Sequence, residues 1–198
     1  MEAIPARHAF GLLARHYRAC HQAALSLVDE LSEEQFQWRP SPGPQSIGWN
    51  LWHIARWDDI MAEGLIGRSP SLRDLGPAIQ IWKSRELASR WGLGATELGV
   101  EEGGTRLAEV DASAVRFPPK SQIAEYATEA FNYLDSALEQ LDDSQLLITL
   151  PGLPLYPGSE QADSYGENVV NWMEHAYRHL GTMEALKGML GLRGSVDD

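Results

Sequence analysis

The chain has 198 residues, a net charge of -12 and a single cysteine. The length suits one domain with a substantial core, the acidic balance argues against a nucleic-acid partner, and one cysteine excludes an internal disulfide and fits a reducing cytoplasm. No stretch has the apolar length of a membrane span, and the N-terminus lacks a basic segment followed by a long apolar one, so we expect neither a membrane anchor nor a signal peptide.

Helix-forming residues dominate the chain, and no run of β-branched residues alternates as a strand would, so the composition predicts an all-α fold. Residues 7–31 carry the first apolar stripe at helical spacing, and we interpret Cys20 within it as a packing residue. The same element contains three histidines without an i, i+4 pair, which we interpret as surface or half-buried residues: His8, His16 and His21.

A short turn and a second long helix are predicted next. Ser32 has Gln35 three residues later, the pattern of a capping box. Residues 38–44, with three prolines and a glycine, break the chain, and Ser46 can then cap a helix over 47–66.

His53 lies in this second helix, on or next to its buried face. Trp49 and Trp57 flank it one helical turn away on either side. A lone histidine at such a position is usually structural. It becomes a candidate ligand only if a second group of histidines meets it.

The middle of the chain, residues 67–120, is rich in glycine and proline and too long for a plain connection, so we expect a lid or a crossover that wraps the other helices. Within it, residues 81–91 could form one helix. A third long helix is predicted over 121–141, with Ser121 as its cap.

A Pro/Gly-rich loop over 150–166 leads to a fourth helix, roughly 167–190. Four long helices with one long connection predict a four-helix bundle in which the second and third helices run parallel. We expect the bundle to be a single domain covering residues 1–198.

Two histidines on the fourth helix, His175 and His179, lie four residues apart, so a helix directs both rings from one face. The same spacing clamps a metal in zinc proteases. Apolar residues at helical spacing place the pair along the inward stripe: Val169, Trp172, Ala176, Met183, Leu186 and Leu190. The pair is either two core histidines bonded to carbonyls or part of a metal site, with His53 as the candidate third ligand.

Three neutral imidazoles around one divalent ion leave open positions, the arrangement of catalytic rather than structural zinc. Imidazole also suits nickel, iron and copper, so the residues leave the metal open. No carboxylate lies one turn from either histidine of the pair on the same face, so a general base has to come from elsewhere. The candidates are Asp58, Asp59, Glu63, Glu125, Tyr126 and Glu129, and two asparagines could orient water or substrate or simply be polar bundle-end residues: Asn50 and Asn171.

Two segments resemble a known family. Residues 46–55, SIGWNLWHIA, look like the second-helix signature of the DinB-like (DinB/YfiT) superfamily, and residues 174–181, EHAYRHLG, resemble its last-helix His-x-x-x-His. The resemblance extends over about residues 8–190. It implies an up-down-down-up four-helix bundle, often a homodimer, with a metal, commonly zinc or nickel, on His53, His175 and His179.

The resemblance also implies a class of chemistry. Characterised relatives include thiol S-transferases that use mycothiol or bacillithiol, and a metal-dependent hydrolase, and the shared chemistry would be a metal-held thiolate attacking an electrophile. One hypothesis is therefore a metal-dependent enzyme, a low-molecular-weight-thiol S-transferase or related hydrolase acting on a small molecule. The other is a non-catalytic bundle in which the histidines or a metal are purely structural.

Overall fold

The computed structural model describes residues 8–40, 45–94, 96–149 and 164–194. No strand forms within these ranges, where only isolated bridges pair extended residues, so the prediction of an all-α fold is confirmed. Among the same residues, no helix combines the length and apolar character needed to span a membrane.

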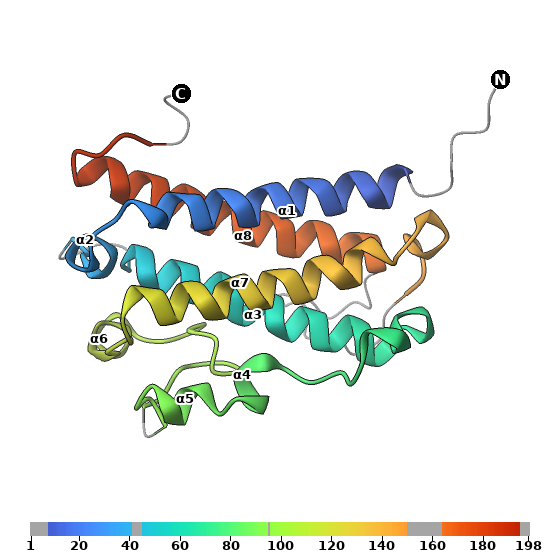
Figure 1. The fold of residues 1–198 in the computed structure, drawn as a ribbon, viewed down its shortest axis with the longest axis horizontal. Coiled ribbons are helices and arrows are strands. Elements are labelled where there is room, and N and C mark those ends of the chain that lie inside the picture. Colours follow the sequence, from blue (N-terminus) through green and yellow to red (C-terminus); the bar gives the residue numbers. More distant parts are fainter. Residues whose placement is uncertain (1–7, 41–44, 95, 150–163, 195–198) are drawn as a thin grey trace.

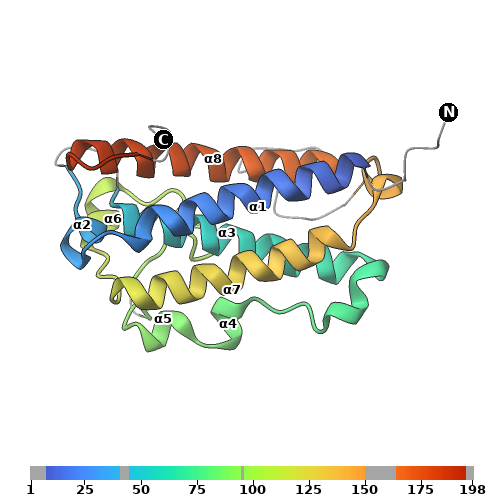
Figure 2. The same cartoon turned by 45° about the horizontal axis from the view of Figure 1, so that its top comes forward.

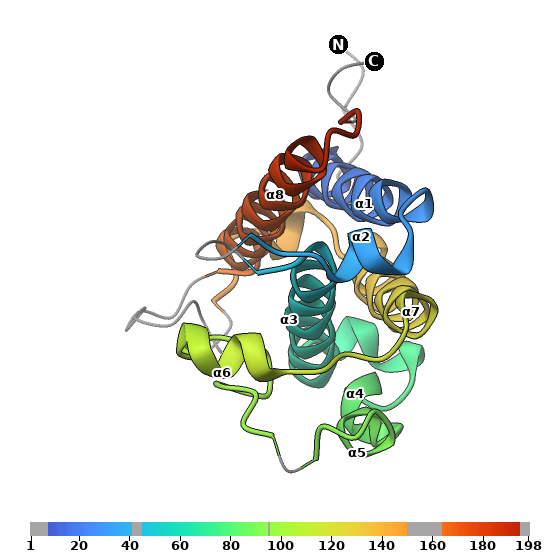
Figure 3. The same cartoon turned by 90° about the vertical axis from the view of Figure 1, so that its left-hand side faces the viewer.

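Four long helices run side by side (Figure 1): α1 (His8–Asp29), α3 (Ile47–Arg68), α7 (Lys120–Glu139) and α8 (Tyr165–Met189). Helix α3 packs against α7 and α8, and α1 packs against the same two helices. The chain follows α1 and α8 in one direction and α3 and α7 in the other (Figure 2). The buried apolar side chains of the four long helices form the core. Figure 3 shows these helices from their ends.

The helix starts follow local capping chemistry. Ser32 and Gln35 form the predicted capping box, at the start of α2 (Glu33–Gln37). The Ser46 side chain caps α3, as predicted, by accepting from the Trp49 backbone N–H.

The predicted cap of the third long helix, Ser121, is wrong. Helix α7 begins at Lys120, directly after Pro119. The Lys120 N–H donates to the carboxylate of Glu33 on α2, at 2.9 and 3.2 Å. A carboxylate from another helix therefore stabilises this N-terminus, where negative charge is favourable, and no local cap is needed.

The segment between α3 and α7 contains η1 (Pro70–Leu75), α4 (Ile81–Ser84), α5 (Leu87–Arg90) and α6 (Glu109–Ala114). The prediction of one helix over 81–91 is wrong, because the backbone turns left-handed at Glu86, with φ 53°. Trp82 and Leu87 are both buried but are five residues apart, and one continuous helix would direct them to different faces. The break lets both side chains reach the core.

The last helix begins close to the predicted position. Helix α8 starts at Tyr165 behind a capping box of Ser164 and Glu167. Most of the predicted loop over 150–166 lies outside the described residues. Before this loop, a short η2 (Asp143–Gln145) follows α7, and none of its residues lines the cavity beside the three histidines.

Candidate metal centre

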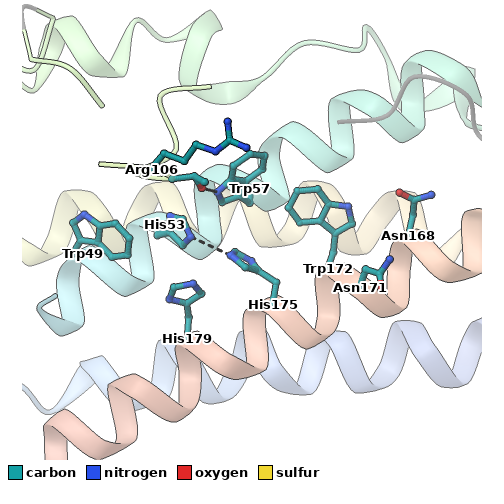
Figure 4. A pocket seen from close by; sticks show the side chains of 11 residues that line it. Trp49, His53, Trp57, Arg106, Asn168, Asn171, Trp172, His175 and His179 are labelled. Atoms are coloured by element: carbon teal, nitrogen blue, oxygen red, sulfur yellow. Dashed lines mark hydrogen bonds between the residues drawn. The ribbon is translucent and has the colours of Figure 1, made fainter. Parts of the chain in front are cut away.

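Helices α3 and α8 bring three histidine rings together at one point between them (Figure 4). His53, His175 and His179 each offer one ring nitrogen, and these nitrogens all lie within 4.8 Å of one another. The ring centres of His53 are 5.0 Å from His175 and 4.4 Å from His179. The three predicted site histidines thus converge from segments more than a hundred residues apart.

The tautomer of His53 is set by a backbone carbonyl. Its Nδ1 lies against the carbonyl oxygen of Gly103, which can only accept a hydrogen bond, so Nδ1 carries the proton. The Nε2 lone pair of the neutral ring then faces the other two histidines. Trp49 stacks on the ring, with centres 4.6 Å apart and planes 15° apart, and fixes its orientation.

The side chain of Asn50 sets the tautomer of His179. Its Oδ1 lies 2.7 Å from His179 Nδ1. The Asn50 amide nitrogen donates to the backbone carbonyls of Gln45 and Ser46, at 3.1 and 2.8 Å, so its oxygen is the atom left to accept from the histidine. Of the two asparagines considered from the sequence, Asn50 therefore orients a histidine, while Asn171 is exposed and lines the adjacent cavity.

The nitrogen of His175 completes a set that suits a divalent ion. His53 Nε2 and His175 Nε2 are 3.1 Å apart. Two nitrogens bound to one tetrahedral zinc at about 2.0–2.1 Å lie roughly 3.3 Å apart, so this separation fits a shared ion. In such sites a histidine usually binds the metal through one ring nitrogen, while its other ring nitrogen donates a hydrogen bond to a protein acceptor.

The three rings are held neutral. Burial lowers the pKa of His53 well below its ordinary value, and the neighbouring His179 and His175 lower it further. Burial also lowers the pKa of His175 to about 3 and of His179 to about 4, and Arg178 adds to both shifts. Their lone pairs are consequently free at neutral pH, as metal binding requires.

A buried arginine holds the loop that supplies the Gly103 carbonyl. Arg56 is fully buried and donates to the carbonyl oxygens of Glu101 and Glu102, at 2.8 and 3.2 Å. At Gly104, φ is 85° and an added Cβ would lie 2.7 Å from Trp49, so the loop approaches α3 as closely as a glycine allows. The sequence reasoning missed Arg56, although an arginine three residues after His53 on a buried helix face was a usable signal.

A cavity of about 400 Å³ opens beside the histidines. Three tryptophans, Trp49, Trp57 and Trp172, form its apolar walls, and Trp57 and Trp172 are in contact, with ring centres 5.1 Å apart. Arg106, on the loop after Gly104, is the charged residue of the lining. No sequence signal pointed to Arg106, since only the fold of the loop brings it to the cavity.

None of the six predicted general-base candidates lines this cavity among the residues the structure describes. Asp58 bonds to Tyr17 and His21, and Asp59 accepts from the backbone N–H groups of Ile81 and Trp82. The others lie at separate contacts: Glu63 with Gln80, Tyr126 with Asp59, Glu129 with Arg85, and Glu125 at a different surface hollow.

The prediction that His21 is a surface or half-buried residue is wrong. It is 2% exposed, lies 2.8 Å from Asp58 and 3.1 Å from Asp135, and stacks on Phe131. Burial alone would lower its pKa, but hydrogen bonds to the two carboxylates outweigh burial and raise the pKa to about 9. Two acidic residues from other helices thus allow a charged histidine inside the core.

Two other residues singled out on this helix, His16 and Cys20, are as interpreted. His16 is exposed, and nothing is described of the side chain of His8. Cys20 is buried, and burial, followed by the charge of Asp58, raises the pKa of its thiol to about 12, so it is a packing residue rather than a nucleophile.

Comparisons with known proteins agree with the fold. The family model of the DinB superfamily matches residues 16–183. A conserved protein from Enterococcus faecalis, known from its crystal structure, superposes with a TM-score of 0.70 at 15% identity, covering 92% of this chain and 98% of that one. At that identity the likeness concerns the fold alone. A search of curated proteins gives no match.

Proposed function

The chain belongs to the DinB superfamily, and on that premise we propose that it is a metal-dependent enzyme whose ligands are His53, His175 and His179. One observation carries the proposal: three neutral imidazoles with free lone pairs meet at the wall of a cavity large enough for a small molecule. Zinc or nickel is the expected ion. The all-helical fold, read as an up-down-down-up four-helix bundle, is a common place for such a site.

Each part of the cavity has a role in this proposal. When bound, a divalent ion would supply a Lewis acid for an anionic sulfur or oxygen of the substrate. Gly103 and Asn50 hold the His53 and His179 rings in their ligating orientation. The tryptophans exclude water from one side of the reacting groups, and Arg106 adds positive charge at the cavity.

The lining favours a thiol as the nucleophile. The described residues around the cavity include no carboxylate that could take a proton from water. A thiol, with an ordinary pKa near 8.5, ionises far more readily than water and depends less on a protein base. We therefore favour a low-molecular-weight-thiol S-transferase over a related hydrolase.

A second candidate function has one observation in its favour. The 3.1 Å between His53 Nε2 and His175 Nε2 also fits a plain hydrogen bond between two rings. In that case the histidines are structural, or a metal only fastens α3 to α8. The proposal also includes a homodimer, which the family resemblance implies, and a cytoplasmic location, which the single cysteine suggests.

The test begins with metal analysis of the gently purified protein. We expect about one equivalent of zinc or nickel per chain, lost in His175→Ala and kept in the matched variant His16→Ala, which changes an exposed histidine on α1. The loaded protein is then offered a panel of low-molecular-weight thiols with a chromogenic chloronitroaromatic electrophile. Substoichiometric zinc, nickel, iron and manganese would contradict the metal site.

Chelation separates the two candidate functions. If EDTA removes the metal and lowers the melting temperature, while no thiol turns over in the loaded protein, the metal is a structural fastener. If EDTA abolishes thiol turnover and metal addition restores it, the enzyme proposal holds.

A further inference from the structure

Asn168 carries a hydrogen-bond acceptor at the cavity that has no partner among the described residues. The residue is 1% exposed and lines the cavity two turns before His175 on α8. Its Nδ2 donates to the carbonyl oxygen of Ser164 at 2.8 Å, so Oδ1 is the atom left over, and it makes no hydrogen bond with the residues that the structure describes. A buried carbonyl oxygen without a donor is costly, which points to a ligand that supplies one.

The distance between Asn168 and the histidines sets the length of that ligand. Seven residues separate Asn168 from His175, which at 1.5 Å per residue is roughly 10 Å along the axis of α8. Figure 4 shows Trp172 between them, with the Asn168 oxygen on the Trp172 side. The rings of Trp172 and Trp57, with centres 5.1 Å apart and planes 34° apart, form an aromatic part of the cavity wall. A flat, apolar segment is what such a wall accommodates.

The charge of the cavity differs in sign from that of the chain. The protein carries a net charge of -12, yet the described lining contains one arginine, three histidines and no carboxylate. Arg106 makes no hydrogen bond or ion pair with the described residues, and a bound divalent ion would add to its positive charge. A cavity of this kind attracts anions out of an otherwise repelling field.

From these three observations we propose that the cavity binds an elongated organic anion with a hydroxyl or amine at its far end. The acidic end lies at the three histidines and Arg106, the flat middle lies along Trp172 and Trp57, and the hydroxyl or amine donates to Asn168 Oδ1. The proposal rests on the proposed function for the metal at the acidic end, while the Arg106 and Asn168 contacts can be measured without it.

The donor contact is tested by titration calorimetry of the zinc-loaded full chain with three probes: 4-hydroxycinnamate, 4-methoxycinnamate and 4-hydroxycinnamamide. We expect the hydroxy acid to bind about tenfold more tightly than its methyl ether, as one hydrogen bond to a buried acceptor allows. Asn168→Leu should remove this preference, and Asn168→Asp, which keeps an acceptor, should retain it. Asn132→Leu, which changes an exposed asparagine on α7, is the matched control and should leave all three affinities unchanged.

The anion contact is tested in the same titrations. We expect Arg106→Gln to weaken both carboxylates about fivefold and to leave the neutral amide unchanged, and Arg106→Lys to retain most of the affinity. A preference for the hydroxy acid that survives in Asn168→Leu overturns the inference, as does the absence of binding by any probe.

Zinc content, measured in each sample, keeps the two proposals apart. If the protein does not retain zinc, the proposed function fails, and the Asn168 and Arg106 comparisons are then decided on the metal-free protein. If zinc is retained but the probes ignore both residues, the metal site stands and the inference about the ligand is wrong.

Discussion

On one side of α3, His53 meets His175 and His179 among tryptophans; on another side, Asp58 of the same helix holds His21 in the core. Positions 53 and 58 lie about 140° apart around the helix axis. Both places are buried, and burial by itself lowers the pKa of an imidazole. The pKa values nevertheless differ greatly, about 3 for His175 and about 9 for His21.

Carboxylates account for the difference. Two of them, Asp58 and Asp135, contact His21. In the cluster, His53 and His179 have a carbonyl and an amide oxygen as their acceptors instead. A protonated imidazole has no lone pair for a metal, so a carboxylate beside the cluster would favour the form that cannot bind. The separation of acids from the cavity therefore keeps the cluster available for a cation, and the acids serve stability on the other side.

The largest expected effect comes from removing a carboxylate from the core. Asp58→Asn takes the charge from a contact with His21 that is almost fully buried. We expect it to lower the free energy of unfolding by about 3 kcal/mol, because the buried charge of His21 keeps only one of its two carboxylate partners, Asp135. Urea denaturation measures the change.

Two controls show whether this effect belongs to the core alone. Glu139→Gln removes an exposed partner of Arg18 and should cost less than about 1 kcal/mol. Metal content should stay the same in Asp58→Asn. Loss of metal from a stably folded Asp58→Asn protein would show that the two sides of α3 are not independent.

A pH profile of the metal-free protein should show both regions at once. The folded pKa of His21, about 9, exceeds the unfolded value near 6.5, so its contribution is complete below pH 6.5 and is lost as the pH rises through 9. This amounts to about 2 kcal/mol between pH 6.5 and 8.5. The cavity histidines have the opposite sign: their folded pKa values are depressed, the unfolded chain binds more protons, and stability falls as the pH drops from 6.5 toward 4.

Variants assign the two limbs of that profile. His21→Gln should flatten the alkaline limb between pH 6.5 and 8.5. His175→Ala should make the acid limb between pH 6.5 and 5 less steep, because His53 and His179 still contribute to it. Unfolding free energies from urea titrations at each pH give the measurement. If His175→Ala changes the alkaline limb instead, the assignment of charge states is wrong.

The contrast between the regions also explains what the sequence could predict. His175 and His179 were predicted because an i, i+4 pair on an apolar stripe is a local pattern. His53 became a candidate only as the third ligand for that pair and through the family resemblance. His21 was misjudged because its environment comes from Asp58 and Asp135, which lie 37 and 114 residues away. The position of Arg106 at the cavity and the contact of Glu33 with α7 also depend on long-range packing, which the local spacing of residues in the sequence does not reveal.

The smallest expected effect concerns Asn50, whose amide oxygen accepts from His179 as the carboxylates of Asp58 and Asp135 accept from His21. Asn50→Leu removes the acceptor of His179 Nδ1 and should weaken metal binding about tenfold, as is typical when a residue that orients a ligand is lost. Asn50→Asp keeps an acceptor for His179 Nδ1 but replaces the amide with a carboxylate, the group that contacts His21 in the core. We expect it to raise the pKa of His179 from about 4 in the metal-free protein, which an NMR titration of the ring protons measures. An unchanged pKa in Asn50→Asp would mean that burial, rather than the choice of acceptor, decides the charge of these histidines.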